Sequence, residues 1–315
     1  MFNLKIIYGL ILLTSSTLFA ENIFNEKDFT KAKKQSNGFH GTLGLSFYAA
    51  SFNGYSDFGN FEQKEGFQLY STPVPNGYLS YMVDGLSVFS KIEVSKGLGV
   101  GLAYGMFELY YVPNQESMLL KFEDPINRQS KSTSYEVESL EFSANEIFDS
   151  PFSLHYSYEE ERVHNDKNGL SRNFTVAQRD LLQRSYRSNR YGVSYEDYLD
   201  DETLIDLKVD YEQNSAKGEA NSYNAYHAEV GLMSSSGAFF YGDVLSYERA
   251  SYGAVNPLEN KTESRDSLMN QMYVGYQYSD NSSYYLSYTL MKENSNINLY
   301  DQTTSFVNLG YSYDF

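Results

Sequence analysis

The sequence predicts an all-β protein, a transmembrane antiparallel up-and-down β-barrel of about 14 strands, and three observations lead to this class. Aromatic residues make up 17% of the 315-residue chain, with 31 Tyr and 21 Phe, although the mean hydropathy is -0.49. A barrel explains how a chain rich in aromatic residues can have a low mean hydropathy, because its rings face lipid while the lumen and loops are polar. Apolar and polar residues also alternate with a period of two through most of the chain. Finally, the connections between these segments are alternately short and, with one exception, long.

The strands and turns follow from this alternation. The clearest strand is 205–212, where apolar residues at odd positions alternate with Asp206, Lys208, Asp210 and Glu212. Asp84-Gly85 between two alternating segments predicts a tight hairpin. Tight turns are expected at 84–85, 113–117, 148–151, 199–202, 234–237 and 279–282. Outer connections are expected at 51–74, 95–97, 124–133, 164–187, 213–221, 249–265 and 293–303. These six turns and seven outer connections predict an even number of strands, with both chain ends on the periplasmic side.

Two segments lose the alternation partway along. The change falls near Gly105 within 102–111 and near Ser139 within 135–144. A one-residue slip moves side chains to the wrong face unless a β-bulge absorbs it. We therefore predict bulges at both places, with 12 strands as the alternative if either segment does not span.

The first residues predict export. Residues 1–20 resemble a secretory signal peptide, with Lys5 before an apolar run at 6–13 that is shorter than the ~20 residues of a membrane-spanning helix. Residues 21–37 are expected to form a periplasmic N-terminal arm, and 38–315 the barrel. The chain contains no Cys, which removes disulfide and thiolate-metal sites.

Charged residues on the polar strand faces are expected to line the lumen. The pore-lining candidates are Glu196, Asp206, Lys208, Asp210, Glu212, His227 and Glu229. Acids outnumber bases among the residues expected in the interior, so one hypothesis is a porin-like channel for small polar or cationic solutes. The alternative is a closed structural or surface-interaction barrel, whose carboxylates pair with Lys, Arg and Tyr hydroxyls inside.

The connection 164–187 is basic, in contrast to the predicted interior. Its candidate residues are Arg172, Arg179, Arg184 and Arg187, and Arg190 and Lys167 lie close by in the sequence. The pattern over 176–187 allows one or two helical turns around Leu181 and Leu182. The arginines can pair with lumen carboxylates or bind an anionic solute if the loop folds inward. They can meet lipopolysaccharide phosphates if it stays outside, or form an ordinary solvated loop.

Other activities have weaker support. His155 and Ser157 resemble the His-x-Ser element of outer-membrane lipid hydrolases, but Tyr158 follows where that element has Asn, and the pair is expected to face inward. A lipid hydrolase is therefore a remote alternative, and no catalytic residue, metal ligand or cofactor is predicted. A net charge of -17 argues against a nucleic-acid partner.

Two resemblances locate the protein. The closing strand 307–315, which ends in Phe315, resembles the C-terminal signature of outer-membrane β-barrels that the barrel-assembly machinery reads. The segments 254–258, 274–278 and 295–301 resemble a proteobacterial outer-membrane family of unknown function, best over roughly 170–315. These resemblances imply the outer membrane of a Gram-negative bacterium after signal-peptide removal, with membrane lipid and lipopolysaccharide as partners, and no established activity.

Overall fold

The chain forms a closed antiparallel β-barrel. The computed structural model describes residues 37–54, 67–93, 96–127 and 130–315. Within them, each of 14 strands pairs with its neighbours in the chain, and β14 pairs with β1 to close the sheet. The predicted fold class is confirmed, and the 12-strand alternative is wrong.

The strands are long, and the helices are short and lie in the connections. The strands are β1 (Gly38–Gly54), β2 (Phe67–Val83), β3 (Leu86–Glu93), β4 (Gly97–Tyr104), β5 (Phe107–Phe122), β6 (Ser132–Ala144), β7 (Phe152–Val163), β8 (Tyr186–Tyr198), β9 (Thr203–Ala216), β10 (Tyr223–Ser236), β11 (Phe239–Asn256), β12 (Lys261–Ser279), β13 (Ser282–Ser295) and β14 (Gln302–Asp314). The helices are η2 (Ile147–Asp149), α2 (Val176–Asp180), η3 (Glu219–Asn221) and η4 (Asn298–Tyr300). In the described part of the chain, no helix is both long enough and apolar enough to cross a membrane.

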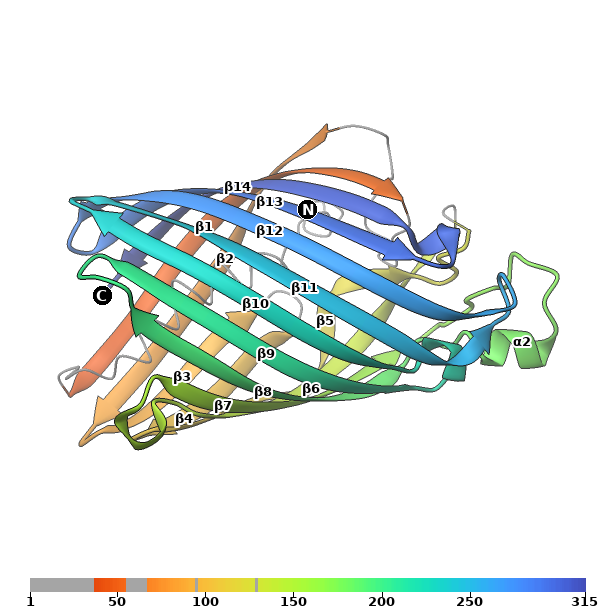
Figure 1. The fold of residues 1–315 in the computed structure, drawn as a ribbon, viewed down its shortest axis with the longest axis horizontal. Helices are drawn as coiled ribbons and strands as arrows, with labels where there is room; N and C mark the ends of the chain where they lie inside the picture. The colour runs from red at the N-terminus through yellow and green to blue at the C-terminus, as the bar shows by residue number, and fades with distance from the viewer. Residues whose placement is uncertain (1–36, 55–66, 94–95, 128–129) are drawn as a thin grey trace, which may run out of the picture.

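The two ends of the barrel differ (Figure 1). The short turns lie at one end, together with the start of β1 and the end of β14, while α2 and the longer connections lie at the other. Gly41 and Phe315 exchange two backbone hydrogen bonds of 3.0 and 2.9 Å across the seam between these two strands. The expected alternation of short and long connections therefore corresponds to the two ends of one barrel.

One predicted turn is correct and another is wrong. The chain turns at Asp84-Gly85, both with positive φ (48° and 81°), as a type I′ hairpin requires. The turn expected at 113–117 lies instead inside β5, and the chain turns at Gly105-Met106. Pro113 has no N–H to donate, so it interrupts the hydrogen-bond ladder without ending the strand.

The two predicted bulges also need correction. The change of pattern near Gly105 is the β4–β5 turn and not a bulge. Strand β6 pairs with β7 without interruption through Ser139, and the register shift opposite it belongs to β5, after Val112. The apolar residues Tyr135 and Val137 stay on the inward face, where they are buried.

The ends of several connections differ from those expected. The expected connection 51–74 is shorter, because β1 continues to Gly54 and β2 begins at Phe67. The predicted signal peptide 1–20 and nearly all of the arm 21–37 lie outside the described residues. Strands β3 and β4 have only 8 residues each, against 17 in β2 and 16 in β5, so this hairpin is about half as long as its neighbours.

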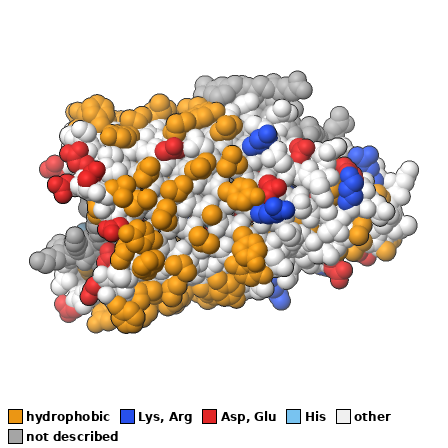
Figure 2. All heavy atoms as spheres, in the orientation of Figure 1, with side chains coloured by type: hydrophobic (Ala, Val, Ile, Leu, Met, Phe, Trp, Pro, Cys, Tyr) orange, Lys and Arg blue, Asp and Glu red, His pale blue; other side chains and the backbone are white. Residues whose placement is uncertain are grey.

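The outer surface carries an apolar belt near the end with the short turns, formed by exposed hydrophobic side chains of strands around the barrel, and Figure 2 shows one face of it. Hydrophobic side chains gather over that end, and polar and charged side chains cover the rest. Rings on neighbouring strands pair along the belt near the turns, as in Phe107–Phe142 (6.1 Å between centroids) and Phe239–Tyr276 (5.1 Å). An exposed apolar band edged by aromatic residues is typical of barrels that cross a bilayer.

Candidate functional site

The inward faces of β7–β11 carry most of the charge in the barrel interior, and we call this surface the charged lumen wall. It contains all seven pore-lining candidates on three adjacent strands. Glu196 lies on β8, the four residues from Asp206 to Glu212 on β9, and His227 and Glu229 on β10. The period-two alternation that predicted these residues puts them on one face, because their neighbours Leu207 and Val209 point outward and are exposed.

A row of residues in register crosses the wall at its centre. His155 of β7 is opposite Gly192 of β8, which is opposite Asp210 of β9, then His227 of β10 and Glu248 of β11. His155 Nε2 contacts Asp210 Oδ1 directly, and His227 Nδ1 lies 3.2 Å from Asp210 Oδ2. The Asp210 side chain has no exposed area, so the two imidazoles stabilise a fully buried carboxylate.

Gly192 makes the contact across β8 possible. A Cβ atom added at Gly192 would lie 1.8 Å from His155 Nε2 and 1.9 Å from Asp210 Oδ1. Both distances are far below van der Waals contact. Because Gly192 has no side chain, a residue of β7 and a residue of β9 can contact each other above β8, the strand between them.

A second group of contacts surrounds Glu212. Arg190 of β8 forms an ion pair with it, and the Ser188 and Tyr223 hydroxyls donate to Glu212 Oε1 at 2.7 and 3.0 Å. Lys208 Nζ lies 3.7 Å from Asp210 Oδ2 on the same strand face. Two of the cations on this wall are thus already matched to carboxylates.

More charged pairs lie beside the wall. Lys96 contacts Glu141 at 2.7 Å and Glu159 at 3.5 Å, and Lys121 contacts Glu161 at 2.6 Å. Neither Glu141 nor Glu161 was among the expected lumen residues. Their inward position follows from the continuous register of β6 and β7, which the changing apolar pattern of β6 obscured.

Two acids of the wall have no cation of their own. Glu229 is in register with Lys208, but no ion pair within 4.0 Å joins them, and its Oε2 atom is buried without a hydrogen-bond partner. Glu248 forms no hydrogen bond or ion pair with any described residue. The wall therefore has an excess of negative charge.

On the opposite side of the lumen, uncharged polar residues line the middle of β13 and β14, and the acids Glu293 and Asp314 lie toward the strand ends. Ser287, Thr289 and Asn308 are each at most 2% exposed on the inward faces of β13 and β14. The Ser283 and Ser312 hydroxyls lie 2.7 Å apart on the same strands. The central part of the interior is thus asymmetric, with charged residues on β8–β11 facing uncharged polar residues on β13 and β14.

The candidate arginines do not form one cluster. Arg187 lies on the outward face of β8, 66% exposed, and contacts Glu160 at 3.2 Å. Arg172 and Arg179 lie in the loop before β8 and in α2, away from the lumen. Arg184 is buried and pairs with Asp166 at 3.0 Å. Among the described parts of this arginine-rich region, the residue that pairs with a lumen carboxylate is Arg190, which reaches Glu212 from strand β8 and not from an inward-folded loop.

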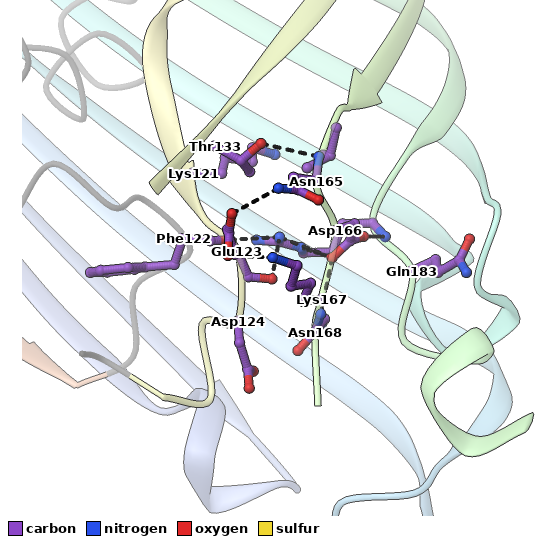
Figure 3. Close-up of polar contacts among 12 residues, drawn as sticks. Lys121, Phe122, Glu123, Asp124, Thr133, Asn165, Asp166, Lys167, Asn168 and Gln183 are labelled. Carbon is purple, nitrogen blue, oxygen red and sulfur yellow. Dashed lines mark hydrogen bonds and ion pairs between the residues drawn. The ribbon is translucent and has the colours of Figure 1, made fainter. Parts of the chain in front are cut away.

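Arg184 helps to join two outer connections into one structure. Its Nη2 atom donates to the carbonyl oxygens of Phe122 and Glu123 at 2.6 and 3.3 Å. Figure 3 shows Lys167 directed toward Glu123, with 2.9 Å between Nζ and Oε2. Asn165 Nδ2 also donates to Glu123, at 2.8 Å. The loop 164–185 is therefore bonded to the end of β5 and does not fold into the lumen.

The short helix in this loop begins as the sequence led us to expect. Thr175 caps α2, accepting from the Gln178 N–H at 3.2 Å, and Gln178 Oε1 accepts from the Thr175 N–H at 3.0 Å. This is a reciprocal capping box, which satisfies N–H groups that a helix leaves open at its first turn. The helix lies within 176–187 but is only five residues long, and it ends before Leu181 and Leu182, around which the sequence allowed helical turns.

The other motifs from the sequence are separated or occupied. His155 is bound to Asp210, and Ser157 lies two residues further along the inward face of β7. The expected tight turn at 199–202 joins β8 to β9, and there the Glu202 N–H donates to Asp200 Oδ1 at 2.9 Å and lowers the pKa of that carboxyl. The described residues hold no group of three or more His, Asp or Glu side chains arranged for a metal ion.

Comparison with solved structures returns barrels at low identity. The chain is similar to outer-membrane expressed OmpT of Vibrio cholerae, at 13% identity and a TM-score of 0.46, covering 90% of this chain and 99% of that one. It is also similar to an anion-selective porin from Comamonas acidovorans (9%, 0.41, covering 89% and 99%). A third is a Pseudomonas aeruginosa FadL homologue (11%, 0.42, covering 87% and 89%).

Comparison with sequence families is more informative. No curated protein matches the chain. The family described as protein of unknown function (DUF2860) matches residues 99–314, so the family region begins earlier than the motifs over 170–315 indicated. The match spans well over half of the sequence, and the chain therefore belongs to the DUF2860 family.

Proposed function

We propose that this protein is an outer-membrane β-barrel that passes small polar or cationic solutes through its lumen. The apolar belt supports a position in the outer membrane of a Gram-negative bacterium, in contact with its lipid and lipopolysaccharide. The β1–β14 seam supports assembly through the closing strand. The polar lumen supports passage of hydrophilic solutes.

The observation that carries the proposal is the uncompensated negative charge of the charged lumen wall. Arg190 and Lys208 lie against Glu212 and Asp210, while Glu229 and Glu248 have no ion pair with a described residue. A fixed excess of carboxylates attracts cations and repels anions in a water-filled passage. The lumen charge therefore favours cations over anions.

The test is conductance of the purified, folded protein in planar bilayers under a KCl gradient. We expect channels whose reversal potential shows preference for K⁺ over Cl⁻. A unit charge about 8 Å from a passing ion contributes about 0.5 kcal/mol in water. Removing two such charges shifts K⁺ and Cl⁻ by about 1 kcal/mol each in opposite directions, so the double variant Glu229→Gln/Glu248→Gln should lower the K⁺/Cl⁻ permeability ratio by up to roughly 30-fold.

The matched control is Glu138→Gln. Glu138 lies on the outward face of β6 and accepts from the Tyr111 hydroxyl at 2.9 Å, so its charge does not face the lumen. This variant should keep the parental ratio. Anion preference in the parent, or an equal effect of both sets of variants, would overturn the assignment of selectivity to the charged lumen wall.

A closed structural or surface-interaction barrel is the second candidate, favoured by the number of lumen charges that pair with one another. Lys96, Lys121 and Arg190 each lie against a glutamate, as the alternative from the sequence requires. Absence of any conductance from folded protein would select this function and reject the channel. In that case the bonded outer loops become the functional surface.

A further inference from the structure

Two polar residues interrupt the apolar belt on one face of the barrel. Asp243 of β11 is exposed on the outward side, between Tyr241 (48% exposed) and Leu245 (43%). Asn270 of β12 lies on the same side, between Leu268 (47%) and Met272 (48%). Figure 2 shows this side of the molecule, with acidic side chains set among hydrophobic ones.

The two residues are bonded to each other. Asn270 Nδ2 donates to Asp243 Oδ1 at 2.5 Å. That bond uses one of the two N–H groups of the carboxamide and one carboxylate oxygen. Within the described residues, neither side chain makes another hydrogen bond. One N–H group of Asn270 and one carboxylate oxygen of Asp243 therefore remain without a partner among the described residues.

Lipid is a poor environment for this pair. Hydrocarbon offers no hydrogen-bonding group, so an open donor and a carboxylate are costly within the belt. On the other described strands, no Asp, Glu, Asn or Gln lies between two exposed apolar neighbours on the outward face. The pair is thus a local exception. A protein surface packed against it would remove this cost by supplying hydrogen-bonding groups.

The chemistry of the pair selects the partner. The open N–H of Asn270 complements a carboxylate, and the open oxygen of Asp243 complements an amide N–H, so the pair is complementary to itself. A twofold axis along the membrane normal keeps each residue at its own depth and brings the same patch of two copies together. A head-to-tail ring would instead place the pair against the apolar belt of another face.

We propose that a second copy of this chain covers the β11–β12 face, forming a twofold dimer in the membrane. Asn270 of each copy donates its second N–H to Asp243 of the other copy. The result is a closed ring of four hydrogen bonds, with Leu245 and Met272 packed around it. This interface lies on the lipid-facing surface and does not depend on solute passage through the lumen.

Disulfide cross-linking in membranes tests the dimer, because the chain contains no Cys. Met272→Cys places one thiol beside the pair and leaves both polar residues intact. Leu102→Cys on β4 is the matched control, since both native side chains are 48% exposed in the belt. Mild oxidation should give a cross-linked dimer from Met272→Cys and none from Leu102→Cys.

The role of the polar pair is then tested in the Met272→Cys protein. Asp243→Leu with Asn270→Leu removes the intermolecular hydrogen bonds, and cross-linking should fall at least about tenfold. Leucine suits a lipid-facing position, so the barrel should stay folded, as its heat-modifiable migration on gels will show. The dimer is rejected if Met272→Cys gives no cross-link, if Leu102→Cys cross-links equally, or if the leucine variants leave the yield unchanged.

Discussion

A single glycine controls the best-defined contact in the lumen. His155 and Asp210 belong to strands that are not neighbours, and they meet because Gly192 leaves the space above β8 empty. A side chain there would not be a neutral change, since the carboxylate it displaces is fully buried and depends on its imidazole partners. At the residue scale, the arrangement of these charged groups depends on Gly192, which has no side chain.

Gly192→Ala should therefore destabilise the barrel. The added methyl group would separate His155 from Asp210 and weaken a hydrogen bond to a buried charge, at a cost of about 2 kcal/mol. Urea unfolding in detergent or lipid measures the change. Gly231→Ala is the control, because its added Cβ meets nothing closer than 3.6 Å, at Asp206 Cβ. Equal losses in the two variants would contradict the role given to Gly192.

At the scale of elements, the outer connections behave as one bonded unit. Asp124, just after β5, accepts from the N–H groups of Gly169 and Ser171 at 3.0 and 2.7 Å. Asn168 and Asn221 both donate to the Leu182 carbonyl, at 2.9 and 2.8 Å. These contacts link β5, the loop 164–185 and the β9–β10 connection at the outer end of the barrel.

Arg184→Ala should loosen this unit without unfolding the strands. It leaves Asp166 without its cation and removes two bonds to backbone carbonyls of 122 and 123. Breaking a buried ion pair of this kind costs about 3 kcal/mol. We expect this cost to lower the local stability of the loop 164–185 and not the stability of the strands. Amide hydrogen exchange over 164–185 should speed up. Arg172→Ala, in an exposed part of the same loop, should leave exchange unchanged, and a similar acceleration there would contradict the assignment.

At the scale of the whole molecule, the barrel is taller than its apolar belt. Strands β11 and β12 have 18 and 19 residues, whereas crossing a bilayer takes about 9–11. Along the outward face of β9, the belt residue Val209 is 60% exposed, and Ser215 lies six positions further toward the outer end. The outer half of the barrel surface is therefore exposed to water and not to lipid. Charged pairs such as Arg187–Glu160 are well tolerated in that environment.

Single cysteines on β9 test the height of the belt. In proteoliposomes, Ser215→Cys should react rapidly with a water-soluble maleimide, because it lies above the lipid. Val209→Cys, on the same face of the same strand, should be protected until detergent is added. Similar labelling rates for both positions in lipid would show that the hydrocarbon boundary lies elsewhere.

The sequence predicted the barrel because its signal is repeated in every strand. Alternation places Leu207 and Val209 outside and Asp210 inside by backbone geometry alone, and Asp84-Gly85 specifies its turn through φ values that few residues adopt. The same local rule placed all seven candidate residues of the wall on inward faces. Where alternation depends on the surroundings, as in β5 and β6, the sequence was misleading, because apolar residues beyond the belt can point inward.

The tertiary structure alone decided the partners of each charge. Which carboxylate meets which cation depends on the register between strands, and on gaps such as Gly192 through which distant strands touch. Arg184 and Arg190 are six residues apart, yet one holds a loop and the other a lumen glutamate. The exposed pair Asp243 and Asn270 became visible only when adjacent strands were aligned. Alternation is a property of one strand, whereas pairing is a property of the closed sheet.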